Sequence, residues 1–591
     1  MSEGRKPQRP LRSNLPRGSY LGAVRAAQWL NLGIAEDDLD KPKIAIVNSS
    51  SELASCFSHL DGIAAELKQA IRAAGALPFE IRTAAPSDFI TGVGARGAYM
   101  LAARDLVTND IEVAVEGAQL DGMVCLASCD KTVPGQLMAA ARLNIPTIVV
   151  ACGYQPSGEY RGEHVDIEDV FVGAMHTLTG KLPVDDLIGM SRNAIRGPGV
   201  CSGLGTANSM HMVSEALGMS LPGSTPIAAN SDRMFAYVRA AGKRIVQMVL
   251  DDLKPRDILT PDAFANAVMT VLAVGGSINT VKHMQAVATE GQIDVDVYGL
   301  FERYASQIPV LTAVRPVGHD TIEQLEAAGG GRAVMKRLEP WLKPGALTVT
   351  GASVADNLRD ALVTDDEVVR TPERAFARQP AIVLVRGNLA PQAGIVKFGI
   401  TPDKQRSFSG RALCYSTSDA AIKAIQDGTI QPGAVVVMRG AGVCGGPAMG
   451  GGASRVVFAL DGAGLSDKVA MLTDGHLSGL VCKGIVVAEV APEAATGGPL
   501  ALVEDGDTIE IDLDRRTCDL HVDEAERQRR RAVWQRPAPV NDTGWLKIYR
   551  ANVGSMPQGA VLTADKASAA PGTAEDGSPS STARSIHGGE A

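Results

Sequence analysis

The sequence has 591 residues, of which 45% are hydrophobic, and a formal net charge of −9. This composition allows a large core, and the acidic balance excludes the basic surface that nucleic acids or anionic membranes require. The first residues lack an apolar signal segment and no run of about 18 apolar residues follows, so we expect a cytoplasmic protein with no membrane or nucleic-acid partner. Nine cysteines are too few for a disulfide scaffold in so long a chain, which leaves them available as thiols or metal ligands.

The first half of the chain predicts alternating strands and helices after a polar arm at residues 1–18. Strands are expected at residues 44–47, 122–127 and 145–150, with helices at 59–74 and 135–143. This alternation is typical of a parallel α/β sheet. A helical segment is expected over residues 232–288, with an interruption at Pro255.

The second half of the sequence has a different pattern, in which short apolar runs are separated by Gly and Pro. Strands are expected at residues 381–385, 434–438, 469–472, 484–490 and 508–511. We therefore predict an α/β fold, in which an N-terminal α/β domain with a parallel sheet spans residues 19–372. A smaller β-rich, barrel-like C-terminal domain is expected over residues 373–564, and a disordered tail over 565–591. The cleft between the two domains is the expected active site.

Three cysteines carry the strongest chemical signal. Cys56 follows the first expected strand, Cys129 follows the second in the motif Cys-Asp-Lys-Thr-Val-Pro-Gly, and Cys201 lies in a Gly-rich turn before a helix. A thiolate beside a carboxylate suggests a soft and a hard metal centre side by side, and a helix start lowers a thiol pKa. From spacing alone, buried core cysteines are the more common explanation. The other six are interpreted as structural: Cys125, Cys152, Cys414, Cys444, Cys482 and Cys518.

Several long motifs occur in a fixed order along the chain. They stand at residues 129–135, 201–223, 275–279, 387–391 and 473–479. Together they resemble the successive signatures of the dihydroxy-acid dehydratase and phosphogluconate dehydratase family, over residues 17–563. The chain is therefore identified as a divergent member of that family.

The resemblance implies an iron-sulfur hydro-lyase that converts a 2,3-dihydroxy carboxylic acid to a 2-oxo acid. Cys56, Cys129 and Cys201 would hold a [2Fe-2S] or [4Fe-4S] cluster and leave one iron open as a Lewis acid for the C3 hydroxyl. The resemblance also implies a homodimer or homotetramer that acts on a small hydroxy acid.

The resemblance assigns a divalent ion, Mg²⁺ or Mn²⁺, to Asp88, Asp130 and Lys131. Lys131 could be a ligand only if carbamylated, because an ammonium group has no lone pair. Ser478 would be the base that removes the C2 proton, acting as an alkoxide beside the metal. Without the resemblance, the two aspartates read as helix N-caps, Lys131 as a surface lysine and Ser478 as a turn residue.

Three further residues are candidate substrate contacts: His59, His476 and Asn279. The alternative for His59 is packing or hydrogen bonding near the cluster, since a lone histidine carries little information.

The chain departs from the family pattern at the hard-metal site. Gly450, Gly451 and Gly452 stand where relatives place a glutamate that binds the divalent ion. The loss of a carboxylate weakens or reshapes such a site. A non-catalytic iron-sulfur relative is therefore the rival hypothesis, and Gly451→Glu separates the two: a large gain in activity indicates a decayed site, and no gain indicates a rebuilt one.

Two other departures from the family pattern help to choose between the possible substrate classes. His476 replaces a frequent arginine, and Leu480 replaces a small or polar residue, so we expect a less cationic and more apolar pocket. With Leu480 and Ile278 as an apolar wall, a dihydroxy acid of the branched-chain amino acid type is favoured. An aldonic acid or a substrate of specialised metabolism is the alternative.

Overall fold

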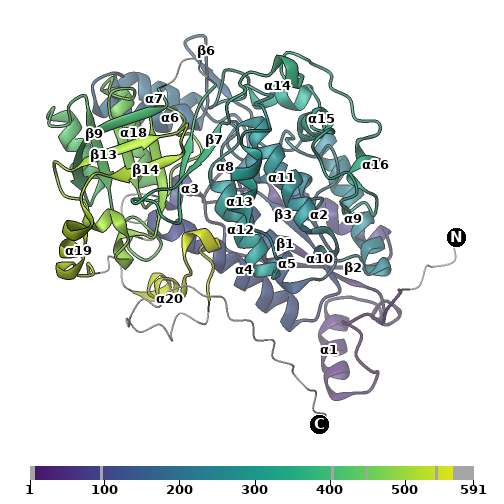
Figure 1. Ribbon diagram of the computed structural model, residues 1–591. Coiled ribbons are helices and arrows are strands. Elements are labelled where there is room, and N and C mark those ends of the chain that lie inside the picture. Colours follow the sequence, from purple (N-terminus) through teal and green to yellow (C-terminus); the bar gives the residue numbers. More distant parts are fainter. Residues whose placement is uncertain (1–6, 93–96, 401–404, 447–449, 539–542, 564–591) are drawn as a thin grey trace.

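The computed structural model describes residues 7–92, 97–400, 405–446, 450–538 and 543–563, and it has two sheets that lie side by side (Figure 1). The first is a parallel sheet flanked by helices, and the second is a larger, nearly closed sheet. The predicted fold class is therefore confirmed. The predicted disordered tail lies outside the described residues, and so do residues 1–6 of the predicted arm. No helix in the described ranges is long and apolar enough to span a membrane.

Four parallel strands form the N-terminal sheet in the order β2-β1-β3-β4. They are β1 (Lys43–Asn48), β2 (Leu77–Arg82), β3 (Gly122–Ala127) and β4 (Thr147–Ala151). Every residue of β1, β3 and β4 is buried, because helices cover the sheet, which explains their continuous apolar runs. The three strands predicted in this half are confirmed.

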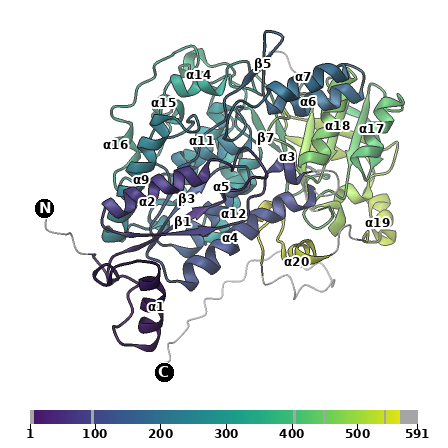
Figure 2. The same cartoon turned by 180° about the vertical axis from the view of Figure 1, so that it is seen from behind.

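Two groups of helices enclose this sheet (Figure 2). Helices α2 (Leu60–Ala73) and α9 (Asp232–Asp251) pack together, and α4 (Tyr99–Gly117), α5 (Thr132–Leu143) and α12 (Asn279–Gly291) form the second group. Gly135 permits the close approach of α5 to α4, since a Cβ there would lie 2.7 Å from the Arg104 carbonyl oxygen. Helix α5 begins at Thr132 rather than at the predicted Gly135.

The remaining elements of this half are short helices and one hairpin. They are α1 (Tyr20–Asn31), α3 (Asp88–Thr91), β5 (Gly158–Tyr160), β6 (Glu163–Val165), α6 (Ile167–Leu178), α7 (Val184–Asn193), α8 (Thr206–Ala216), α10 (Pro255–Ile258), α11 (Pro261–Val274), α13 (Val297–Tyr304), α14 (Ile322–Ala327), α15 (Gly330–Arg337) and α16 (Val354–Leu358). The predicted helical segment 232–288 thus contains four helices, and Pro255 begins one of them. The described part of the arm is docked, because the Ser13 hydroxyl donates to Asp121 at 2.6 Å.

The C-terminal sheet has the order β14-β13-β9-β10-β11-β12-β8-β7. Its strands are β7 (Ile382–Val385), β8 (Ala393–Lys397), β9 (Ser407–Tyr415), β10 (Ala434–Met438), β11 (Ala470–Thr473), β12 (Val486–Ala491), β13 (Thr508–Asp512) and β14 (Thr517–Leu520). Strands β9 to β12 are parallel, and a bridge between Arg386 and Thr517 brings the two edges together. All five predicted strands are present. Helices α17 (Ser418–Gln426), α18 (Gly450–Gly462), α19 (Glu524–Val533) and α20 (Gly544–Asn552) accompany them.

A fully buried ion pair joins the two halves. Lys282 Nζ on α12 lies 2.5 Å from Glu489 Oε1 on β12, and neither side chain is exposed. Burial lowers the pKa of Lys282 to about 8, although the carboxylate of Glu489 opposes the shift. Lys282 also donates to the Asn279 amide oxygen.

We expect Lys282→Met to destabilise the protein by about 3–5 kcal/mol, because Glu489 would be left buried without its charge partner. The double variant Lys282→Met/Glu489→Leu should recover most of this loss. Urea unfolding followed by fluorescence measures both. As a control, Arg359→Met removes an exposed pair with Asp356 and should change stability by no more than about 0.5 kcal/mol. Equal losses in the single and double variants would contradict the prediction.

Candidate functional site

The carboxyl ends of the parallel strands form the floor of the candidate site. Strand order reverses between β1 and β3, and ligands of open α/β sheets bind outside the strand ends at such a point. Cys56 follows β1, and Cys129, Asp130 and Lys131 directly follow β3. Cys201 comes after Val200, which bridges to Tyr154 beyond β4. The topology therefore brings together residues that are distant in the sequence.

The three predicted cluster cysteines converge here as free thiols. Hydrogen bonding to Cys56, burial, and the nearby carboxylates of Asp130 and Asp88 raise the pKa of Cys129 well above its usual value. Burial and the charge of Glu168 likewise raise the pKa of Cys201. The expected lowering of the thiol pKa by a helix start is therefore wrong for Cys201. For Cys201, the first N–H groups of α8 are used elsewhere, as shown next.

Asp130 caps a helix other than the one that follows it. Its carboxylate accepts hydrogen bonds from the Thr206 hydroxyl and the Ala207 N–H at the start of α8. The N-cap residue of α5 is Lys131, and it makes no side-chain cap bond. The alternative of a local N-cap is therefore wrong for Asp130. Burial and the Asp88 carboxylate raise the pKa of Asp130 to about 7.

Lys131 and Asp88 form a hydrogen-bonded ion pair in this region. Lys131 Nζ donates to Asp88 Oδ2 at 2.7 Å, and the lysine is only 2% exposed. Lys131 is therefore no surface lysine. Burial opposes its charge, but the carboxylates of Asp88 and Asp130 outweigh burial and raise the pKa of Lys131. Asp88 is the first residue of α3 after the N-cap Ser87, which makes no side-chain cap bond.

Ser478 reaches the same region from the second sheet, in the loop after β11. The loop is held by its backbone: Asn279 Nδ2 donates to the Leu477 carbonyl at 3.1 Å, and Lys397 Nζ donates to the Gly479 carbonyl at 2.7 Å. The Leu480 N–H donates to Ser478 Oγ at 3.3 Å. That donor stabilises negative charge on the serine oxygen.

Most of these residues line one cavity of about 180 Å³ between the two halves, whereas Cys56 is not among its lining residues. Of the predicted site residues, the lining includes Cys129, Cys201, Asp88, Asp130, Lys131, Asn279, His476 and Ser478. Phe89, Phe171, Met100 and Leu480 form its apolar surface. Ile278, expected in the apolar wall, is fully buried and is not part of the lining.

The two candidate histidines differ in position. His59 is not among the lining residues, and its Nε2 lies 2.7 Å from the Cys152 carbonyl oxygen, as its alternative interpretation expected. His476 lines the cavity, and its buried Nε2 has no hydrogen-bond partner among the described residues. Burial and the charges of Lys282 and Lys131 hold the pKa of His476 well below its usual range, so it is a neutral side chain.

Glu168, which the sequence did not single out, also lines the cavity. It lies in the first turn of α6, between Asp166 and Asp169. Only its acidity marked it in the sequence, and acids are ordinary at helix starts.

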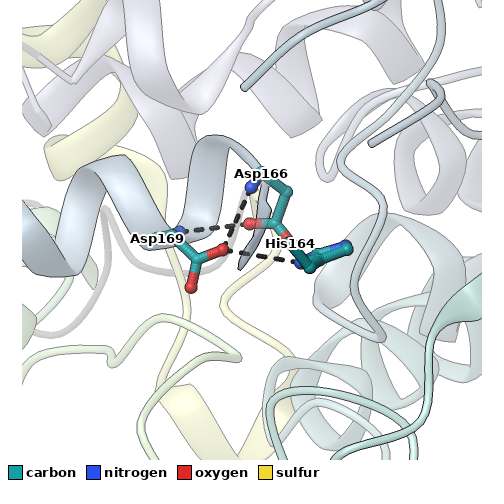
Figure 3. A group of neighbouring side chains, drawn as sticks. All are labelled: His164, Asp166 and Asp169. Atoms are coloured by element: carbon teal, nitrogen blue, oxygen red, sulfur yellow. Dashed lines mark hydrogen bonds and ion pairs between the residues drawn. The ribbon is translucent and has the colours of Figure 1, made fainter. Parts of the chain in front are cut away.

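His164, Asp166 and Asp169 form an acidic group beside this helix start (Figure 3). Their possible ligand atoms lie within 4.8 Å of one another, and Asp166 and Asp169 form the capping box of α6. Arg315 already supplies a cation, since its guanidinium donates to His164 Nδ1 at 2.9 Å and to Asp169. We therefore interpret the group as a capped helix start with an ion pair.

Comparison with known proteins decides the family. Residues 41–357 match the dihydroxy-acid/6-phosphogluconate dehydratase N-terminal family model, and residues 367–560 match the C-terminal one. The chain belongs to this dehydratase family. It is 38% identical to the dihydroxy-acid dehydratase of Ignicoccus hospitalis over 91% of this chain and 98% of that protein. Enzymes of the same name from Acetivibrio thermocellus and Pyrococcus abyssi are 37% and 38% identical over 93% of this chain and their full lengths.

Membership of this dehydratase family makes the chain a hydro-lyase. The donor set fits the two groups that the family resemblance implies. Soft thiols meet hard carboxylates at one cavity, and Asp88 Oδ1 is buried without a hydrogen-bond partner among the described residues. A divalent cation beside Asp88 and Asp130 would offset the repulsion that raises the pKa of Asp130. Gly450 to Gly452, where the resemblance leads us to expect a glutamate, begin α18.

Proposed function

We propose that this chain removes water from a 2,3-dihydroxy carboxylic acid and releases a 2-oxo acid. Cys56, Cys129 and Cys201 would hold an iron-sulfur cluster, and Asp88 and Asp130 would hold Mg²⁺ or Mn²⁺. The observation that supports this most is that the cysteine and carboxylate motif after β3 shares one cavity with Ser478 from the other sheet. When bound, the two metal centres supply Lewis acids for the leaving C3 hydroxyl and for the carboxylate and C2 hydroxyl.

The protein's own residues account for the proton transfers. As an alkoxide, Ser478 Oγ takes the C2 proton, and the C3–O bond breaks so that hydroxide leaves. The proton that Ser478 gained from C2 then passes to this hydroxide, which leaves as water and restores the alkoxide. The resulting enol becomes the 2-oxo acid by tautomerisation. The N–H of Leu480 stabilises Ser478 Oγ while it is anionic. Lys131 holds Asp88 in place as an ammonium group, and carbamylation would make it a third oxygen ligand.

Two substrate classes fit the cavity. The shared name of the relatives fits a dihydroxy acid. The apolar side chains of Leu480 and Phe171 favour a short one of the branched-chain amino acid type. The described lining contains no arginine, which disfavours a phosphorylated sugar acid. An unphosphorylated sugar acid is the second candidate, because the Glu168 carboxylate faces the same cavity.

The test is a 2-oxo acid assay on anaerobically purified protein, reconstituted with iron and sulfide, with Mg²⁺ or Mn²⁺ added. The panel contains branched and straight-chain 2,3-dihydroxy acids and sugar acids. We expect one 2-oxo acid per substrate consumed, without an added oxidant. A fully loaded protein that turns over none of them would contradict the proposal and favour the non-catalytic relative.

A cytoplasmic homodimer or homotetramer completes the proposal. Tyr20, Leu21 and Val24 expose apolar surface on α1, which projects from the body of the protein (Figure 1). An exposed apolar surface of this kind is typical of contacts between subunits.

A further inference from the structure

Glu168 is a buried acid in the wall of the cavity. Its side chain is only 7% exposed, and its backbone N–H donates to Asp166. The carboxylate makes no hydrogen bond or ion pair with any residue that the structure describes. Its small exposed area faces the cavity that also contains Cys201 and Ser478. Glu168 has no role in the proposed proton transfers.

Two glycines make room for this carboxylate. A Cβ on Gly205 would lie 3.1 Å from Glu168 Oε1, and a Cβ on Gly203 would collide with the same carboxylate. Both glycines line the cavity, in the turn that follows Cys201. A residue larger than glycine at position 203 or 205 would therefore displace the Glu168 carboxylate.

Burial and the carboxylates of Asp166 and Asp169 raise the pKa of Glu168 well above its usual range. Arg315 and Lys397 oppose this shift only from a distance. Arg315, however, is paired with Asp169 and His164, and Lys397 donates to the Gly479 carbonyl. A buried polar group without a hydrogen bond is costly, and a ligand that supplies the missing bond recovers that cost. A ligand that places an alkyl group there leaves the carboxylate both desolvated and unpaired.

We propose that Glu168 determines substrate specificity by accepting a hydrogen bond from a hydroxyl group that the substrate carries beyond C3. The preferred substrate is then a 2,3-dihydroxy acid with at least one further hydroxyl, as in the unphosphorylated sugar acids. This inference rests on the proposed dehydration and decides between its two substrate classes. Leu480 and Phe171 then contact the carbon chain, and Glu168 contacts its distal hydroxyl.

Two four-carbon acids that differ by one hydroxyl test the inference. The loaded wild-type enzyme, Glu168→Gln and Glu168→Leu are assayed with 2,3-dihydroxybutanoate and 2,3,4-trihydroxybutanoate. We expect the wild type to favour the trihydroxy acid by at least about 10-fold in kcat/KM, as sites that hydrogen-bond a substrate hydroxyl do. Glu168→Leu should abolish or reverse this ratio, and Glu168→Gln should keep part of it because the amide oxygen still accepts a hydrogen bond. Glu159→Gln, at the exposed residue of β5, is the control and should keep the wild-type ratio.

Binding provides a readout without turnover. In the Ser478→Ala background, the trihydroxy acid should bind more weakly when Glu168→Leu is added, whereas binding of the dihydroxy acid should not weaken. Iron content and the visible spectrum check that each variant retains its cluster. If Glu168→Leu weakened the binding of both acids by the same factor, Glu168 would have a structural role, and the inference would be overturned.

The remaining outcomes separate the inference from the function on which it rests. Wild-type turnover of the dihydroxy acid without preference for the trihydroxy acid overturns the role of Glu168 and leaves the dehydratase intact. No turnover of either acid, or of any other panel member, by fully loaded wild type overturns both.

Discussion

Ser478→Ala should lower kcat by about 10²- to 10⁴-fold, the range that a positioned base contributes. Ser478 Oγ lies in the cavity with the carboxylates and accepts the N–H of Leu480. The loop itself is fixed through backbone atoms, by Asn279, Lys397 and the Ser454 hydroxyl that accepts the Ser478 N–H at 2.8 Å. Removal of the hydroxyl should therefore leave the loop in place and reduce the rate without changing iron content.

The control for this variant is Ser466→Ala, which removes a hydroxyl that donates to Asp461 at 3.2 Å, away from the cavity lining. It should retain wild-type kcat. Steady-state kinetics and iron analysis are made on the same preparations of both variants. A Ser478→Ala enzyme within a factor of a few of wild type would exclude this serine as the base.

Cys129→Ser should remove the cluster, and with it all measurable turnover. The serine hydroxyl keeps the size of the thiol but is a poor ligand for iron-sulfur clusters, which prefer thiolates. Cys129 lies just after β3, hydrogen bonded to Cys56 and beside Asp130. Iron and sulfide analysis after anaerobic reconstitution measures the loss directly.

Cys125→Ala is the matched control, since Cys125 lies in the core on β3, the strand that precedes Cys129, and burial alone raises its pKa. This variant is expected to lose some stability, because it leaves a small cavity, but to bind iron as the wild type does. If Cys129→Ser retained full iron content while Cys125→Ala lost it, the assignment of the cluster cysteines would be wrong.

Most of the fully buried strands of both sheets were predictable, because apolar runs such as that of β10 have few other interpretations. The fully buried strand β8 was missed. Strand β9 was missed, since its sequence Ser-Phe-Ser-Gly-Arg-Ala-Leu-Cys-Tyr mixes polar and apolar residues and is only partly buried. The order of the strands depends on pairings between distant segments, such as β9 with β13. No local pattern encodes such pairings.

The candidate site residues that lie in recognisable motifs, such as Cys129, Asp130 and Ser478, were predictable. The contacts that these side chains make were not predictable. Asp130 resembled the cap of its own helix but binds the start of α8, which only the tertiary structure brings near. Glu168 resembled a solvated acid at a helix start, and its burial follows from the glycine turn that packs on it.

The proposed dehydration requires that turnover depend on the cluster content of the protein. Preparations of wild-type protein loaded with increasing amounts of iron and sulfide are assayed with 2,3,4-trihydroxybutanoate and 2,3-dihydroxybutanoate, with and without Mg²⁺. We predict that the rate of 2-oxo acid formation rises in proportion to the cluster content and falls when Mg²⁺ is withheld. A rate that does not depend on iron, or a fully loaded protein that forms no 2-oxo acid, would contradict the account.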